Sequence, residues 1–399
     1  MPVSDGGLGL PIREYLMVTV VAAAVTFILT GPVRSLAIRI GAVAWPRSRD
    51  VHVKPTPRLG GLAMLGGVLA GLLVAFQLPA LRLAFSQASV FNLPEVVGVA
   101  IAAALLTAVG GLDDRFELDA LTKLAGQTTA AGVLVLFGVQ WAVFWVPWGG
   151  GLTSAGSALV LSQIQGMLLT VLLTVALVNG MNFVDGLDGL AAGIGCVAAT
   201  ATCLFSLGLL YKAGNDPSAY SPALVAALLA GACFGFLPHN FNPARIFMGD
   251  SGSMLIGIML AAATTMASGR IPFASTDGRD VVGLMAPLVV LAAVVFVPLL
   301  DLLMAVVRRT RAGNSPFSPD KMHLHHRLLE IGHSQRRAVL LIYLWAAVLA
   351  FGAVALAVTD DTGTVLWGVG FGLVLAVLAT AVPRRSVRGD STHRVGSRH

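Results

Sequence analysis

The sequence contains few charged residues and few cysteines. Asp, Glu, Lys and Arg make up 12% of its 399 residues, whereas hydrophobic residues make up 56% and the mean hydropathy is +0.83. This composition excludes an ordinary soluble domain. The three cysteines, Cys196, Cys203 and Cys233, lie in apolar stretches without the spacing of a disulfide framework or a zinc site. The sequence therefore predicts a polytopic membrane protein whose cysteines are packing residues.

Hydrophobic runs follow one another along almost the whole chain. Eleven are long enough to cross about 30 Å of hydrocarbon as helices. We therefore predict an all-α, polytopic membrane helix bundle with about 11 transmembrane helices, forming one transmembrane domain over 1–383, and a basic, disordered tail over 384–399. The predicted spans are about 14–34, 59–80, 96–112, 121–139, 164–182, 189–211, 222–239, 252–268, 283–306, 338–358 and 364–383.

Basic residues are distributed unevenly between the two sides of the predicted bundle. Of the 26 Lys and Arg residues, 21 fall in loops after odd-numbered spans or in the tail, and 5 fall on the other side. Because basic loops stay in the cytoplasm, the N-terminus is predicted to lie outside and the C-terminus in the cytoplasm. No nucleic-acid motif accompanies the net charge of +6, so no nucleic acid is expected as a partner.

Three acidic clusters lie where predicted spans end or begin, all on the predicted cytoplasmic side. Charge at a membrane edge is costly and is kept mainly for function. Carboxylate and amide oxygens on a tight, glycine-permitted turn are ligands that a hard cation such as Mg²⁺ prefers. The clusters therefore predict a cation site. Their members are Asp113 and Asp114 in the first, Asn179, Asn182, Asp185 and Asp188 in the second, and Asp250 in the third.

Each cluster also has a simpler interpretation. Asp113 and Asp114 either form an acid–base pair, in which one carboxylate accepts a proton, or belong to a solvated acidic loop. Lys123 either neutralises a phosphate or extends its charge to the membrane surface. Asp250 is either a metal ligand or a helix N-cap. The position of all three clusters on one membrane face favours the functional interpretation.

Two further loops carry basic side chains suited to an anionic substrate. Lys54 and Arg58 precede the glycine pair at 60–61, where backbone amides can approach a phosphate; alternatively, these charges only set topology. The run at 323–327 lacks the thiolates or distant ligand of a zinc site, so its imidazole and guanidinium groups are predicted to face an anion. That run contains His323, His325, His326 and Arg327.

Together these loops resemble the polyprenyl-phosphate N-acetylhexosamine-1-phosphate transferases. The resemblance covers nearly the whole chain in the right order and implies that the bundle is a catalytic domain. A homodimer is also suggested by the family. The motifs are PRLGG at 57–61, DDRFELDALTK at 113–123, NGMNFVDGLDGLAAG at 179–193, NPARIFMGDSG at 242–252 and PDKMHLHHRLL at 319–329.

The resemblance implies transfer of GlcNAc-1-phosphate from UDP-GlcNAc to a membrane polyprenyl phosphate, undecaprenyl or decaprenyl phosphate, with release of UMP. This step would start lipid-linked cell-envelope glycan synthesis at the cytoplasmic face of the plasma membrane. The HLHHRLL run resembles the GlcNAc branch, because Arg327 and Leu328 replace the HHHFE-like run of the branch that uses UDP-MurNAc-pentapeptide. That second branch is one alternative, and a cation-coupled transporter is another.

The family also implies roles for individual residues. Mg²⁺, with Mn²⁺ as an alternative, would be held by Asp250 and Asn182. Asp113 would deprotonate or orient the lipid phosphate, with a direct displacement favoured over an aspartyl-phosphate intermediate. The other implied roles are shaping the site for Asp114, phosphate neutralisation for Lys123, catalysis for Asp185, uridine contact for Asp188, Asn240 and Phe247, and sugar or diphosphate binding for the run from His323 to Arg327.

Overall fold

A computed structural model describes residues 10–45, 55–85, 93–146, 157–212, 214, 216, 219–268, 310–311, 333–359 and 361–381. Within these ranges the chain is almost entirely helical. The long helices are α1 (Ile12–Ile40), α2 (Gly60–Gln77), α3 (Glu95–Phe116), α4 (Ala120–Leu136), α5 (Gln163–Val184), α6 (Leu190–Lys212), α7 (Tyr220–Asn240), α8 (Gly249–Ser268), α11 (Gln335–Val358) and α12 (Thr362–Ala381). A short 3-10 helix, η1 (Leu81–Phe85), follows α2.

These helices confirm the predicted membrane bundle. Each coincides with one predicted span, whereas the predicted span 283–306 and the tail 384–399 lie outside the described residues. In the part of the chain that the structure describes, nine helices are long and apolar enough to cross a membrane. The remaining helix, α4, has 17 residues and is a shorter apolar helix.

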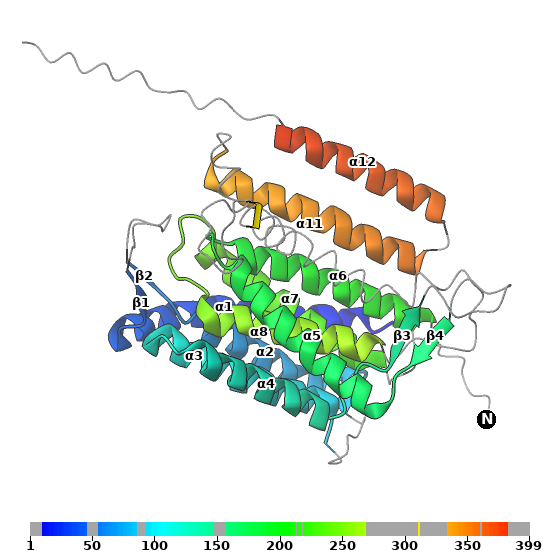
Figure 1. Ribbon diagram of the computed structural model, residues 1–399, viewed down its shortest axis with the longest axis horizontal. Coiled ribbons are helices and arrows are strands. Elements are labelled where there is room, and N and C mark those ends of the chain that lie inside the picture. Colours follow the sequence, from blue (N-terminus) through cyan, green and yellow to red (C-terminus); the bar gives the residue numbers. More distant parts are fainter. Residues whose placement is uncertain are drawn as a thin grey trace, which may run out of the picture.

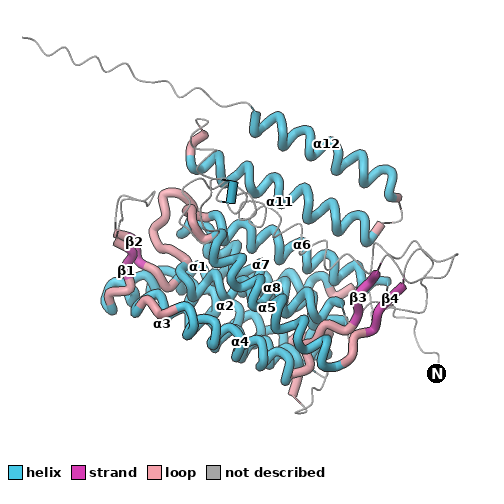
Figure 2. The backbone as a smooth tube through the Cα atoms, in the orientation of Figure 1, coloured by secondary structure: helices cyan, strands magenta, loops and turns pink. Residues whose placement is uncertain are grey.

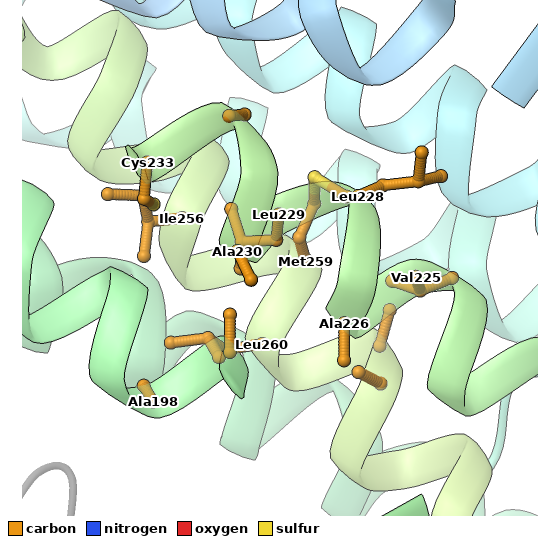
Figure 3. Packing of buried hydrophobic residues seen from close by; sticks show 14 of the residues in the cluster. Ala198, Val225, Ala226, Leu228, Leu229, Ala230, Cys233, Ile256, Met259 and Leu260 are labelled. Carbon is orange, nitrogen blue, oxygen red and sulfur yellow. The ribbon is translucent and has the colours of Figure 1, made fainter. Parts of the chain in front are cut away.

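The helices run side by side, with α7 and α8 inside the bundle and α12 at its edge (Figure 1). The most apolar segment of α8 is completely buried, whereas only 6% of that of α12 is buried. Figure 3 shows Leu229, Ala230 and Cys233 of α7 packing near Ile256 and Met259 of α8. Helix α12 packs mainly against α11, and most of its large hydrophobic side chains are exposed.

Small residues allow the inner helices to approach closely. A Cβ atom at Gly231 of α7 would lie 2.3 Å from the Thr19 carbonyl oxygen, and one at Gly235 would lie 2.1 Å from the Ala23 carbonyl oxygen. Both carbonyls belong to α1. Close backbone approach through small residues one turn apart is a common way for helices to pack in membranes. The pair therefore fixes α7 against α1.

Two short antiparallel hairpins mark opposite ends of the bundle (Figures 1 and 2). One consists of β1 (Val43–Ala44) and β2 (Thr56–Pro57), between α1 and α2. The other consists of β3 (Val143–Val146) and β4 (Ser157–Val160), between α4 and α5. The first hairpin lies at the end of the bundle where α3 and α5 finish and α4 and α8 begin.

Candidate active site

Asp113 and Asp114 lie in the last turn of α3. The sequence had predicted a loop after residue 112. Neither glycine nor proline interrupts the chain between 112 and 116, so the helix continues until Glu117 adopts a left-handed conformation. Both aspartates are buried, with 7% and 6% of their surface exposed. Since neighbouring helical residues point about 100° apart, the two carboxylates serve different partners.

Asp113 shares the ammonium group of Lys123 with Asp250. The Lys123 Nζ atom lies 2.6 Å from Asp113 Oδ2 and 3.0 Å from Asp250 Oδ2. These residues come from the end of α3, the first turn of α4 and the first turn of α8. The other Asp113 oxygen accepts a 2.7 Å hydrogen bond from the Leu118 amide. Three predicted site residues therefore converge, and the lysine balances two partly buried carboxylates.

Asp114 caps the N-terminus of α8 from another helix. Its Oδ1 atom accepts a 2.9 Å hydrogen bond from the Asp250 amide, and its Oδ2 atom accepts bonds from the Ser251 amide and hydroxyl. The alternative that Asp250 is itself the N-cap is therefore wrong, because Asp250 lies inside α8. A carboxylate at this position accepts hydrogen bonds from the free amides of the first helical turn, and its negative charge interacts favourably with the helix dipole.

Glycines let the neighbouring segments reach the start of α8. Gly249 has φ of +70°, and a Cβ atom there would lie 2.3 Å from Asp114 Oδ2. A Cβ atom at Gly61 would lie 2.2 Å from the Ser251 carbonyl carbon, and the Gly61 amide donates to the Met248 carbonyl. Gly61 thus packs against the backbone at the start of α8.

The second cluster divides between a helix and a turn. Asn179 and Asn182 belong to the last turns of α5, as the predicted span 164–182 implies, and not to the glycine-permitted turn that was predicted to present their oxygens. The Asn182 Nδ2 atom donates a 3.1 Å hydrogen bond to Ser253 Oγ of α8, and its side chain also lies beside the Asp250 carboxylate. Asp185 ends α5 and begins the turn that leads to α6.

Asp188 and Asn240 join that turn to the loop before α8. Asp188 Oδ2 accepts 3.0 Å hydrogen bonds from Asn242 Nδ2 and from the Ala244 amide. The buried Asn240 side chain accepts from the Gly189 amide and donates to the Ile246 carbonyl. Both ends of the Asn240 amide therefore bind backbone in this structure, so its observed contacts hold two loops together.

The remaining predicted substrate residues are only partly described. Arg58 is half-buried between β2 and α2, close enough for its charge to act on Asp185. Phe247 lies in the loop before α8, where its amide donates to the Pro57 carbonyl. Lys54, His323, His325, His326 and Arg327 lie outside the described residues.

Several residues at the site were missed by the sequence interpretation. Ser251 and Ser253 lie one and three residues after Asp250, so hydroxyls at the start of a helix were a usable signal. Gln127 was visible as a polar residue in an apolar segment, four residues after Lys123. Tyr343, whose hydroxyl donates to the Gly189 carbonyl, comes from a distant segment and had no local signal.

The carboxylates make the site strongly acidic. Burial, and after it the nearby Asp250 and Asp114 carboxylates, raises the pKa of Asp185 from its ordinary value of 3.8 to about 8. Among the described residues, no three or more His, Cys, Asp or Glu side chains are grouped as metal ligands. The Asp250 carboxylate, beside the Asn182 side chain, nevertheless offers hard oxygen ligands of the kind that suit a cation bound to substrate phosphates.

The fold and this site define a helical membrane protein with a carboxylate–lysine centre at one end of its bundle. Residues 96–268 match the model of glycosyl transferase family 4. The chain is 55% identical to the decaprenyl-phosphate N-acetylglucosaminephosphotransferase of Mycolicibacterium smegmatis, over 96% of this chain and 92% of the relative. It therefore belongs to the polyprenyl-phosphate N-acetylhexosamine-1-phosphate transferase family.

Other relatives extend the similarity to more distant bacteria. The enzyme of the same name from Mycobacterium tuberculosis strain H37Rv is 54% identical, over 98% of this chain and 94% of the relative. A probable undecaprenyl-phosphate N-acetylglucosaminyl 1-phosphate transferase of Bacillus subtilis is 31% identical, over 84% of this chain and 83% of the relative.

Proposed function

We propose that this protein transfers GlcNAc-1-phosphate from UDP-GlcNAc to decaprenyl phosphate and releases UMP, at the cytoplasmic face of the plasma membrane. The observation that carries the proposal is the Asp113–Lys123–Asp250 cluster at one end of a membrane bundle, in a chain similar along its length to transferases of this kind. The cytoplasmic assignment is supported by the excess of basic residues on that side.

The reaction is a displacement between two phosphates. An oxygen of the lipid phosphate attacks the phosphorus that carries GlcNAc, the bond from that phosphorus to the bridging oxygen breaks, and UMP leaves. Such transfers depend mainly on positioning and charge neutralisation. Asp113 accepts a proton from the lipid phosphate or orients it, and the Lys123 ammonium offsets the charge that gathers on the phosphates.

Mg²⁺ fits the oxygen atoms at this site. Asp250 and Asn182 would hold it, and substrate phosphates would complete its coordination, since Mg²⁺ is usually bound by one or two carboxylates together with phosphates. The metal would neutralise negative charge on the diphosphate. The bond from Asn182 Nδ2 to Ser253 leaves the amide oxygen Oδ1 as the cation-binding atom. Asp114 keeps the first turn of α8, and with it Asp250, in place.

The proposal is tested by measuring UMP release from purified protein given decaprenyl phosphate, Mg²⁺ and either UDP-GlcNAc or UDP-MurNAc-pentapeptide. We expect Mg²⁺-dependent release with UDP-GlcNAc alone, and its loss in Asp250→Ala. Release with the pentapeptide alone would assign the other branch of the family. Absence of release with both substrates would contradict the transferase and favour a cation-coupled transporter. The transporter hypothesis, however, expects carboxylates near the middle of the membrane.

A further inference from the structure

Four helices around the site are joined into a closed ring by polar side chains. The helices α3, α4, α5 and α8 pack against one another in that circular order. Each junction contains a hydrogen bond or an ion pair between side chains. The junctions are Lys123 with Asp113 for α4 and α3, Asp114 with Ser251 for α3 and α8, Asn182 with Ser253 for α5 and α8, and Gln127 with Asn179 for α4 and α5.

The α4–α5 junction is a reciprocal pair of side-chain amides. Asn179 Nδ2 donates to Gln127 Oε1 at 2.7 Å, and Gln127 Nε2 donates back to Asn179 Oδ1 at 3.4 Å. Gln127 is 2% exposed. Asn179 Nδ2 also donates to the Val175 carbonyl at 2.8 Å within α5. An unpaired amide as buried as that of Gln127 is costly, so Gln127 depends on Asn179 for both of its side-chain hydrogen bonds. Two bonds between planar groups also fix the rotation and the height of α4 relative to α5.

The pair lies one helical turn from two residues of the proposed reaction. Gln127 follows Lys123 by four residues in α4, and Asn179 precedes Asn182 by three residues in α5. Residues at these spacings share a helix face. The other three junctions each include a residue assigned to binding or chemistry. The Gln127–Asn179 junction includes no residue that the proposed reaction uses, but it lies one helical turn from both Lys123 and Asn182.

We propose that the Gln127–Asn179 amide pair is a positioning device that fixes where the Lys123 ammonium lies relative to the Asn182 amide. It acts on turnover more than on capture of the nucleotide sugar. Its effect on catalysis rests on the proposed function, but the effect on the spacing of α4 and α5 does not. Gln127 is a positioning residue that the chemical motifs themselves do not contain.

Kinetics of four variants test the effect on turnover. We expect Gln127→Leu and Asn179→Leu each to lower kcat about 10- to 100-fold, with a change in KM for UDP-GlcNAc below about threefold. The kcat of the double Leu variant should be no lower than that of the less active single variant, because the same junction is lost in all three variants. The exchanged variant, Gln127→Asn with Asn179→Gln, restores two facing amides of the same combined length and should recover most of the activity.

A matched control separates positioning from general stability. Thr170, near the other end of α5, accepts a 2.9 Å hydrogen bond from the Trp141 amide, so Thr170→Val removes a buried polar contact away from the site. We expect it to lower the thermal midpoint without lowering kcat. Equal kcat losses in Thr170→Val and Gln127→Leu, or no recovery in the exchanged variant, would show that the amide pair has only a structural role.

A distance measurement tests the same inference without the reaction. Spin labels at Leu121 of α4 and Phe183 of α5, both largely exposed, would be placed in a background without the three native cysteines. We expect a narrow distance distribution that broadens or shifts in Gln127→Leu and narrows again in the exchanged variant. An unchanged distribution in Gln127→Leu overturns the positioning role. A broadened distribution with no UMP release by the unmutated protein rejects the proposed function alone.

Discussion

The Asp114 carboxylate accepts a 2.9 Å hydrogen bond from the backbone amide of Asp250, so one acidic residue holds another in place. The two belong to α3 and α8 and are separated by 136 residues. Asp114 also accepts the amide and the hydroxyl of Ser251. Its oxygens are thus directed at the helix start, whereas Asp113 faces Lys123. The adjacent aspartates therefore divide their work between chemistry and support.

Replacing Asp114 by Asn is expected to destabilise the protein and to impair the site. The amide offers one acceptor and turns an N–H group toward α8, so the cap is partly lost at a cost of about 1–2 kcal/mol. We expect a lower thermal midpoint in detergent, lower kcat and a higher Mg²⁺ concentration for half-maximal activity. Asp361, whose Oδ1 accepts the Thr364 amide at the start of α12, provides a control, since Asp361→Asn should leave kinetics unchanged.

Lys123→Met is expected to abolish most activity by removing the cation between Asp113 and Asp250. Two partly buried carboxylates then repel each other and the substrate phosphates. We expect kcat to fall at least about 100-fold, by analogy with the loss of a charge-stabilising group. Lys212→Met serves as the control, because Lys212 Nζ binds the Ala357 carbonyl in a contact outside this cluster. Near-normal kcat in Lys123→Met would remove the lysine from the mechanism.

Asp113→Asn is expected to remove turnover while the bundle remains folded. The variant keeps the size of the side chain and an acceptor for the Leu118 amide, but it cannot take a proton. UMP release and the thermal midpoint should be measured together. Turnover retained in the folded Asp113→Asn variant contradicts the base role. A phosphorylated enzyme trapped when the unmutated protein is given UDP-GlcNAc alone would replace direct displacement with an aspartyl-phosphate pathway.

The sequence was sufficient to predict the helical bundle and the composition of its acidic clusters. Asp113 and Lys123 lie in one motif, at the end of one span and the start of the next, but their ion pair was not predicted. The sequence could not reveal that Asp114 caps α8, since this depends on how distant helices pack. For Asn179 and Asn182 the predicted span 164–182 was correct and the turn was wrong, because glycines near the end of α5 are typical of turns but are tolerated inside membrane helices.

The raised pKa of Asp185 predicts a specific dependence of stability on pH. In the unfolded chain this carboxyl ionises near its ordinary pKa of 3.8, whereas burial and the Asp250 and Asp114 carboxylates raise the folded pKa to about 8. Between these values the folded state binds more protons, so the free energy of unfolding falls as pH rises from about 4 to about 8 and then levels off.

Asp185→Asn removes this contribution of the Asp185 carboxyl to the pH dependence of stability. Thermal midpoints in detergent with EDTA should therefore separate increasingly from pH 5 to 8, with the variant higher, and the difference should stay constant above that range. A constant difference from pH 5 to 8, with the unmutated protein at least as stable as the variant, would mean that Asp185 is already ionised in the folded protein.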